Sequence, residues 1–209
     1  MFKELIKGAG IAAIAGGVLA CVLTPLMSIG YYQAYAVQSE TPPFWFSAVQ
    51  PLLSFLFSFA DVKIVYTTYG KLFVGVYLLF LPGVWALHKL QEKAGSKFEK
   101  ACFVFLMIAL VVSFIGVSLD YWGIKSGWSL ELLGMLLLQI AATMYGVASL
   151  RLKIIARPIA VLLAMAFPLC IAAFLLVKQI PSAPTLPFAI ASIAIGAFVL
   201  SSGKRLLDS

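Results

Sequence analysis

Long apolar segments without charged residues dominate this chain and constrain its fold more than any other feature. A helix needs about 20 mostly apolar residues to cross a bilayer, with a usual range of roughly 17 to 25. Lipid forms no hydrogen bonds with backbone N–H and C=O groups, so only helices and closed barrels span a bilayer. Continuous apolar runs favour helices over a barrel. The sequence therefore predicts an all-α, polytopic membrane bundle forming a single domain, residues 1–209. The six expected spans are Ile6–Val37, Leu72–Leu90, Ala101–Leu119, Trp128–Leu150, Pro158–Val177 and Leu186–Ser202.

Composition agrees with this fold class. Only 11% of the 209 residues are charged and 63% are hydrophobic, which leaves too few charges to cover a soluble domain of this length. The net charge of +7 comes from residues that flank the apolar segments, without interleaved aromatic residues. We therefore expect the lipid bilayer as a partner and no nucleic acid.

The basic residues divide unequally between the two sides of the predicted bundle. With both termini in the cytoplasm, eleven of the 15 lie on the cytoplasmic side, as the positive-inside rule requires. These are Lys3, Lys7, Lys89, Lys93, Lys97, Lys100, Arg151, Lys153, Arg157, Lys204 and Arg205; the other side holds Lys63, Lys71, Lys125 and Lys178. The sequence thus predicts cytoplasmic N and C termini and a multi-pass protein of a prokaryotic cytoplasmic (inner) membrane.

The apolar segment 42–61 follows the first span and is interrupted by Pro51. If it crossed the membrane, every later loop would change sides and most basic residues would lie outside. Proline suits the first turn of a helix, so we expect a half-helix at residues 51–61 with Gln50 as its cap. Its length of about 16 Å is half a bilayer, so it lies along the outer surface or re-enters the membrane.

The polar residues of this outer segment leave two roles open. They form a lid over an outward-facing cavity, or an interfacial anchor, and the anchor is favoured because such helices need no ligand to be stable. The residues concerned are Trp45, Ser54, Ser58 and Asp61.

Catalytic and metal-binding motifs are missing from the sequence. The single histidine, His88, excludes a multi-histidine metal site or bis-histidine haem, and we expect it at the membrane interface near a helix C-terminus. The three cysteines fall within predicted spans without a CxxC spacing. We therefore expect no catalytic residues, no metal and no cofactor.

The fourth expected span carries polar residues at membrane depth. Gln139 and Thr143 share a helical face, and Glu131 lies two turns away and about 80° around the axis. Polar side chains in lipid usually face the bundle interior or a cavity. These three residues are candidates for a substrate or proton site open to the outside. The alternative is structural: Gln139 bonds a neighbouring helix and Glu131 sits at a wet helix N-terminus.

The first expected span carries small residues every four positions. Such rows let two helix backbones approach closely. The face can pack within the chain or receive a partner subunit, and both alternatives remain open. Its candidate residues are Ala12, Gly16, Gly17 and Ala20.

The outline of six spans, cytoplasmic termini and a small-residue first helix resembles the substrate-capture subunits of energy-coupling-factor vitamin importers. That resemblance implies a small molecule bound from outside, partly under the loop after the first helix, and a partner docked on that helix. It is a likeness of architecture, without a matching binding motif.

Three functions are compatible with these observations. The first is a non-enzymatic subunit or accessory partner of a membrane complex, acting through the first helix. The second is a small-molecule transporter or capture subunit with its site in the fourth span. The third is an enzyme acting on lipid, should Asp61, Asp120 and Glu131 gather on the outer face.

Overall fold

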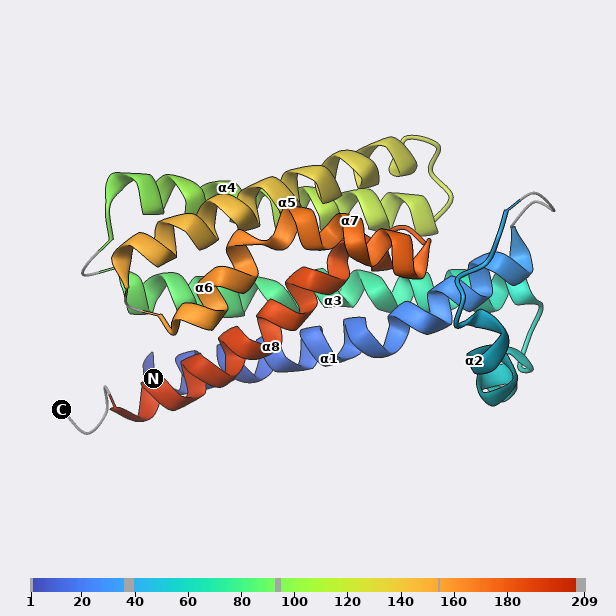
Figure 1. The fold of residues 1–209 in the computed structure, drawn as a ribbon, viewed down its shortest axis with the longest axis horizontal. Helices are drawn as coiled ribbons and strands as arrows, with labels where there is room; N and C mark the ends of the chain where they lie inside the picture. The colour runs from blue at the N-terminus through green and yellow to red at the C-terminus, as the bar shows by residue number, and fades with distance from the viewer. Residues whose placement is uncertain (1, 36–39, 93–94, 154, 206–209) are drawn as a thin grey trace.

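Helices make up the structure, a computed structural model that describes residues 2–35, 40–92, 95–153 and 155–205 (Figure 1). Five of them are long and apolar enough to cross a membrane, and the bent pair α6 and α7 makes a sixth span if counted together. The described part of the chain is thus the all-helical bundle that the sequence predicts, compatible with a multi-pass membrane protein. Its elements are α1 (Phe2–Ala34), α2 (Phe46–Leu53), the 3₁₀ helix η1 (Ser54–Phe57), α3 (Val62–Gln91), α4 (Lys97–Tyr121), α5 (Gly127–Leu152), α6 (Arg157–Ala164), α7 (Ala166–Val177) and α8 (Ser182–Arg205).

The two ends of the bundle differ in charge. The first turn of α1 and the last turn of α8 lie at one end, and α2 lies at the other (Figure 1). We call the first the basic end, because it collects Lys3, Lys7, Lys89, Lys97, Lys100, Arg151, Lys153 and Arg157. The opposite end is called the α2 end. Lys93 and the side chains of Lys204 and Arg205 lie outside what the structure describes.

Glycines bring the backbones of α4 and α5 close together. A Cβ atom at Gly116 would overlap the backbone of Glu131, one at Gly127 would overlap that of Asp120, and one at Gly134 would lie 2.7 Å from the Cα of Ser113. The absence of these Cβ atoms lets the two backbones touch, as small residues do between membrane helices. The α4–α5 hairpin is therefore held by backbone contact along its outer half.

The fifth expected span, residues 158–177, is bent, as Pro168 within it indicates. Met165 separates α6 from α7, and their axes differ by 66°. Pro168 explains the position, since it has no N–H to bond the carbonyl of Ala164 and its ring crowds that carbonyl. The chain bends at the residue after Ala164.

The short outer helix also differs from expectation. It comprises α2 and η1, residues 46–57, so the prediction of a helix starting at Pro51 and reaching residue 61 is wrong. The helix starts early because the carbonyl of Trp45 accepts from the N–H groups of Ala48 and Val49, at 3.2 and 3.1 Å. Pro51 lies inside α2, and the chain tightens to a 3₁₀ turn shortly after it. The helix is still too short to cross a bilayer.

The other boundaries shift by smaller amounts, with one exception. α3 begins at Val62 instead of Leu72, because the Asp61 carboxylate accepts from the N–H of Lys63 at 2.9 Å and caps the helix. The extra turns include Thr67 and Thr68, whose hydroxyls bond back to the helix, so hydropathy gave no sign of them. α1 ends at Ala34, and the expected end at Val37 lies outside the described residues.

The arrangement of the two ends predicts opposite labelling in intact cells. In a cysteine-free background, Ser126→Cys at the α2 end should react with a membrane-impermeant maleimide added outside, and Ser96→Cys at the basic end should not. Both serines are exposed on the protein surface, so a difference in labelling reports the side of the membrane on which each one lies. Labelling of Ser96→Cys without permeabilisation would refute the orientation.

The contact between α4 and α5 predicts a steric cost at Gly116. Gly116→Ala should lower the free energy of unfolding in detergent by roughly 1–3 kcal/mol, because the new Cβ forces backbone apart. Gly75→Ala is the matched control, since a Cβ there meets nothing within 4 Å. It should change stability by no more than about 0.5 kcal/mol. Equal effects at both positions would contradict the close pairing.

Candidate functional site

Gln139 and Thr143 of α5 each form a hydrogen bond with the backbone of a neighbouring helix. The buried Gln139 amide donates from Nε2 to the carbonyl of Pro184 at 2.8 Å, near the start of α8. Thr143 Oγ1 accepts from the N–H of Phe167 at 3.2 Å, in the first turn of α7. Gly146, one turn further, lets the end of α6 approach until its backbone touches α5. This face of α5 therefore supports the break between α6 and α7.

Glu131 lies on a different face of α5, against α4. Its side chain is 0% exposed, and neither carboxyl oxygen has a hydrogen-bond partner among the described residues. The carboxyl group of Asp120, half-buried at the end of α4, interacts with it directly. The structure thus pairs Glu131 with Asp120 and gives Gln139 and Thr143 separate partners.

Hydroxyl and amide groups surround this pair. Tyr121 donates its hydroxyl to the Tyr66 hydroxyl at 3.1 Å, and Gln179 Nε2 donates to the same oxygen at 3.1 Å. Tyr77 shares a hydrogen bond of 2.8 Å with Thr185. All three tyrosine hydroxyls lie near enough to Glu131 for an electrostatic interaction. We call this set the carboxyl cluster: Tyr66, Tyr77, Asp120, Tyr121, Glu131, Gln179 and Thr185.

Sequence reasoning missed most of the carboxyl cluster. It found Glu131 because a carboxylate in an apolar segment is conspicuous. The tyrosines and Gln179 come from α3, α4 and the connection before α8, and no spacing in the sequence relates them. The glycine at position 116 was the available sign that the backbone of another helix approaches there.

A second polar group is buried at the basic end, around His88 in the last turn of α3. His88 is 7% exposed; its Nδ1 lies 2.8 Å from Oε1 of the fully buried Glu99, and its ring stacks on Phe103 at 3.9 Å between centroids. Gln91 Nε2 donates to the Tyr145 hydroxyl at 2.9 Å. We call His88, Gln91, Glu99 and Tyr145 the histidine cluster. The turn between α3 and α4 places His88 opposite Glu99, which the sequence pattern did not reveal.

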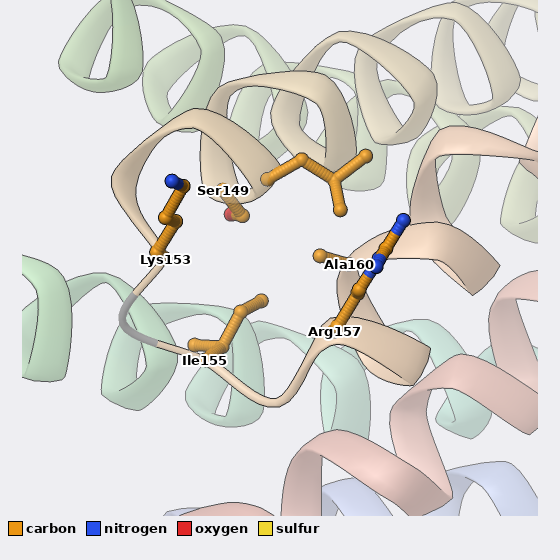
Figure 2. A pocket seen from close by; sticks show the side chains of 6 residues that line it. Ser149, Lys153, Ile155, Arg157 and Ala160 are labelled. Atoms are coloured by element: carbon orange, nitrogen blue, oxygen red, sulfur yellow. The ribbon is translucent and has the colours of Figure 1, made fainter.

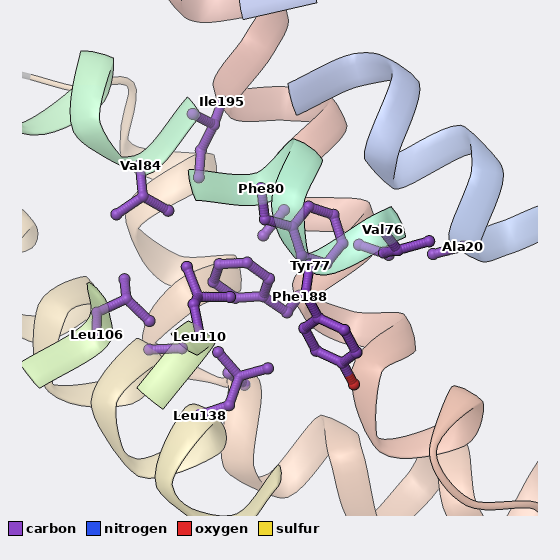
Figure 3. Packing of buried hydrophobic residues seen from close by; sticks show 14 of the residues in the cluster. Ala20, Val76, Tyr77, Phe80, Val84, Leu106, Leu110, Leu138, Phe188 and Ile195 are labelled. Carbon is purple, nitrogen blue, oxygen red and sulfur yellow. The ribbon is translucent and has the colours of Figure 1, made fainter. Parts of the chain in front are cut away.

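An apolar layer separates the two clusters. Along α3, α4 and α5 the residues between them include Phe80, Leu106, Leu110 and Leu138, which are all 0% exposed. Phe188 of α8 joins them, its ring 5.1 Å from that of Phe80. Figure 3 shows these side chains gathered between the four helices. The structure therefore has a polar cluster toward each end and a layer of buried apolar side chains between the two clusters.

The rows of small residues on α1 pack mostly against other helices of the same chain. A Cβ at Gly16 would lie 2.8 Å from Leu79 of α3, and one at Gly17 would lie 2.5 Å from the carbonyl oxygen of Ala189 in α8. Ala20 is fully buried against Val76 (Figure 3). Ala12 lines a shallow groove between α1 and α3. Most of the expected docking face is therefore an internal packing surface.

The polar residues of the outer segment form hydrogen bonds with backbone groups of the protein. Trp45 donates its indole N–H to the carbonyl of Leu176 at 2.8 Å, which ties the start of α2 to the end of α7. The hydroxyls of Ser54 and Ser58 bond carbonyls three residues earlier, and Asp61 caps α3. Apolar side chains of this segment, Phe44, Leu52, Phe55 and Phe59, are largely exposed. Exposed apolar side chains of this kind are compatible with the expected interfacial anchor.

The described residues show no metal site, and comparisons with known proteins found no relative. Within the described ranges, no three His, Cys, Asp or Glu side chains lie close enough together to hold a metal ion. Comparisons with protein-family models, with curated proteins and with solved structures gave no match.

The contact between Thr143 and Phe167 predicts a structural cost instead of a binding defect. Thr143→Val removes the acceptor at constant shape and should lower the free energy of unfolding by roughly 0.5–2 kcal/mol, as the loss of a helix cap does. Thr143→Ser keeps the oxygen and should stay near wild type. Thermal or denaturant unfolding in detergent measures both. Wild-type stability of Thr143→Val would contradict the capping role.

Proposed function

We propose that this protein is a proton-linked small-molecule transporter in the cytoplasmic membrane of a prokaryote, with Glu131 and Asp120 as its proton-binding site. One observation carries the proposal: the Glu131 carboxyl is fully buried, interacts with a second carboxyl, and forms neither a hydrogen bond with a donor nor an ion pair among the described residues. Ionisable groups inside a membrane are rare and usually belong to ion or substrate pathways.

The surroundings of Glu131 favour a proton as its occupant. An ionised carboxylate needs donors or a cation when it leaves water, because its desolvation is costly. Two carboxyls in contact also disfavour a charge on both, so such pairs hold a proton between them. Asp120 is half-buried and nearer the surface, so it connects Glu131 with water at the α2 end.

The distribution of charge sets the side from which protons enter. Basic flanks prefer the cytoplasm, so the basic end is cytoplasmic and the carboxyl cluster is open toward the outside. The histidine cluster then lies on the cytoplasmic side, where His88 and Glu99 supply a second pair of groups able to exchange a proton. Each side of the membrane has its own buried polar site.

The apolar layer and the broken span support transport by alternating access. Phe80, Leu110 and Leu138 block a continuous polar path, so movement of a proton between the clusters requires the helices to rearrange. The break between α6 and α7 is a feature of transporters, in which discontinuous helices lie near substrate sites. The 66° bend gives the bundle a natural point of movement.

The other two functions find less support. A subunit docked through α1 would need Gly16 and Gly17, which already pack against α3 and α8. A lipid-acting enzyme would need Asp61 beside Glu131, yet Asp61 caps α3 through the N–H of Lys63. An outward-facing capture site, as in the vitamin-importer subunits, shares the position of the carboxyl cluster and is tested with it.

Solid-supported membrane electrophysiology on reconstituted protein tests the proposal. A rapid drop in external pH should produce a transient current as protons bind, and Glu131→Gln should reduce it to background, because its amide cannot be protonated. Asp120→Asn should reduce it in part. Solutes from a panel of sugars, amino acids and organic acids should then be added at low pH, and a solute-dependent current that requires Glu131 identifies the substrate.

A matched variant separates this site from a general loss of acidic charge. Glu4→Gln removes an exposed carboxylate paired with Lys7 at 3.1 Å and should leave the current unchanged. Folding of each variant is verified by its unfolding transition. A full-sized current in well-folded Glu131→Gln would refute the proposal.

A further inference from the structure

A pocket of about 690 Å³ opens at the basic end, and its lining includes no residue of either polar cluster. It lies where α5 ends and α6 begins, and it is formed by both helices and the connection between them (Figure 2). Its lining residues are Ser149, Leu150, Lys153, Ile155, Arg157 and Ala160. None of these residues takes part in the proposed proton site.

Two cationic side chains flank the pocket. Lys153 ends α5 in a left-handed conformation, with φ of 55°, and its N–H bonds the carbonyl of Ser149 at 3.2 Å. Arg157 begins α6, and Figure 2 shows it on the opposite side of the pocket from Lys153. Both are exposed and neither forms an ion pair with a carboxylate in the described residues. The pocket thus presents two uncompensated positive charges.

The third polar group is a buried hydroxyl without a partner. Ser149 is 0% exposed, lines the pocket, and its Oγ has no hydrogen-bond partner among the described residues. Serines inside helices usually bond the carbonyl four residues earlier, as Ser113 and Ser118 do here at 2.8 and 2.6 Å. Ser149 departs from this pattern, and Figure 2 shows its hydroxyl on the pocket side between Lys153 and Arg157.

The start of α6 adds few donors. Pro158 in its first turn has no N–H, and the N–H groups of Ile159 and Ala160 already bond the carbonyl of Ala156, at 3.0 and 3.3 Å. The two cations and the buried hydroxyl therefore carry the site, and they match the donors that bind a phosphate group.

The remaining walls are apolar. Leu150, Ile155 and Ala160 line the pocket beside the polar groups, so its occupant combines an anion with an apolar part. We propose that the pocket binds a phosphate group bearing an apolar substituent, with Arg157 and Lys153 holding the anion and Ser149 donating a hydrogen bond to it. Two sources carry this chemistry: a phospholipid of the adjacent leaflet and a soluble phosphate ester. Basic pockets between membrane helices on the cytoplasmic side bind lipid phosphates in this way.

Native mass spectrometry of the detergent-extracted full chain tests this site with defined probes. The lipid probe is dioleoylphosphatidylglycerol, the soluble probe is octyl phosphate, and dioleoylglycerol is the control without phosphate. A phosphate probe should bind one to one, and dioleoylglycerol should not. Binding of the lipid without octyl phosphate identifies a lipid site, whereas displacement of the lipid by octyl phosphate identifies a site for soluble esters.

Variants decide whether the bound phosphate occupies this pocket. Lys153→Gln with Arg157→Gln should weaken binding at least about tenfold, because hydrogen bonds to charged groups are the strong ones. Ser149→Ala should weaken it about threefold. The matched control, Lys97→Gln with Arg151→Gln, removes two exposed cations of the same end that do not line the pocket and should change affinity less than about twofold.

Two results would overturn the proposal: no phosphate probe binds the wild-type chain, or the pocket variant and the control lose affinity equally. The substituted cations are exposed, so both double variants should fold, and their unfolding transitions verify this. Proton currents are expected to be unchanged in the pocket variant. Failure here therefore leaves the transport proposal standing, and the reverse also holds.

Discussion

The backbone contact between α4 and α5 is the constraint on which the rest of the outer half depends. Gly116 allows the backbone of Glu131 to lie directly against it, and this closeness removes the glutamate from lipid and water alike. Without the contact, Glu131 would sit at a wet helix start and lose any special chemistry. The same pairing brings Asp120 beside it. A packing interaction between two glycine-lined surfaces thus creates the most unusual electrostatic environment in the described part of the molecule.

The break between α6 and α7 shows how a local chain property and a tertiary contact cooperate. Pro168 removes a hydrogen bond from the helix ladder, and this frees the chain to bend. Thr143 then accepts from the exposed N–H of Phe167, and Gly146 gives the end of α6 room against α5. Two polar residues in the apolar part of α5 therefore have different roles. Thr143 stabilises an irregular backbone, as lipid requires, whereas Glu131 faces the carboxyl group of Asp120 without a hydrogen-bond donor.

Two buried polar clusters lie at different levels of the bundle, and Gln139 and Thr143 lie between them along α5. The carboxyl cluster and the histidine cluster sit on opposite sides of Phe80, Leu106 and Leu138. The proposed proton exchange depends on this separation, because the apolar layer blocks a direct path between the clusters. The pocket proposed to bind phosphate lies at the basic end, where α5 ends and α6 begins. A ligand held there by Lys153 and Arg157 would tether the end of α5 to the start of α6, next to the broken span.

The sequence by itself determined the features that the surrounding solvent dictates: the helical fold, the number of apolar spans, the asymmetric charge, and Glu131 as an outlier. These depend on hydropathy and local chain properties, which are readable residue by residue. It misplaced the ends of the outer helix, because hydrogen bonds to the Trp45 carbonyl override hydropathy, whereas Pro168 indicated the bend in the fifth span. Tertiary structure alone decided which polar residues meet. The pairing of His88 with Glu99, the contact of Glu131 with Asp120 and the isolation of the Ser149 hydroxyl all depend on which helix faces lie in contact, and that is a property of packing, not of any single segment.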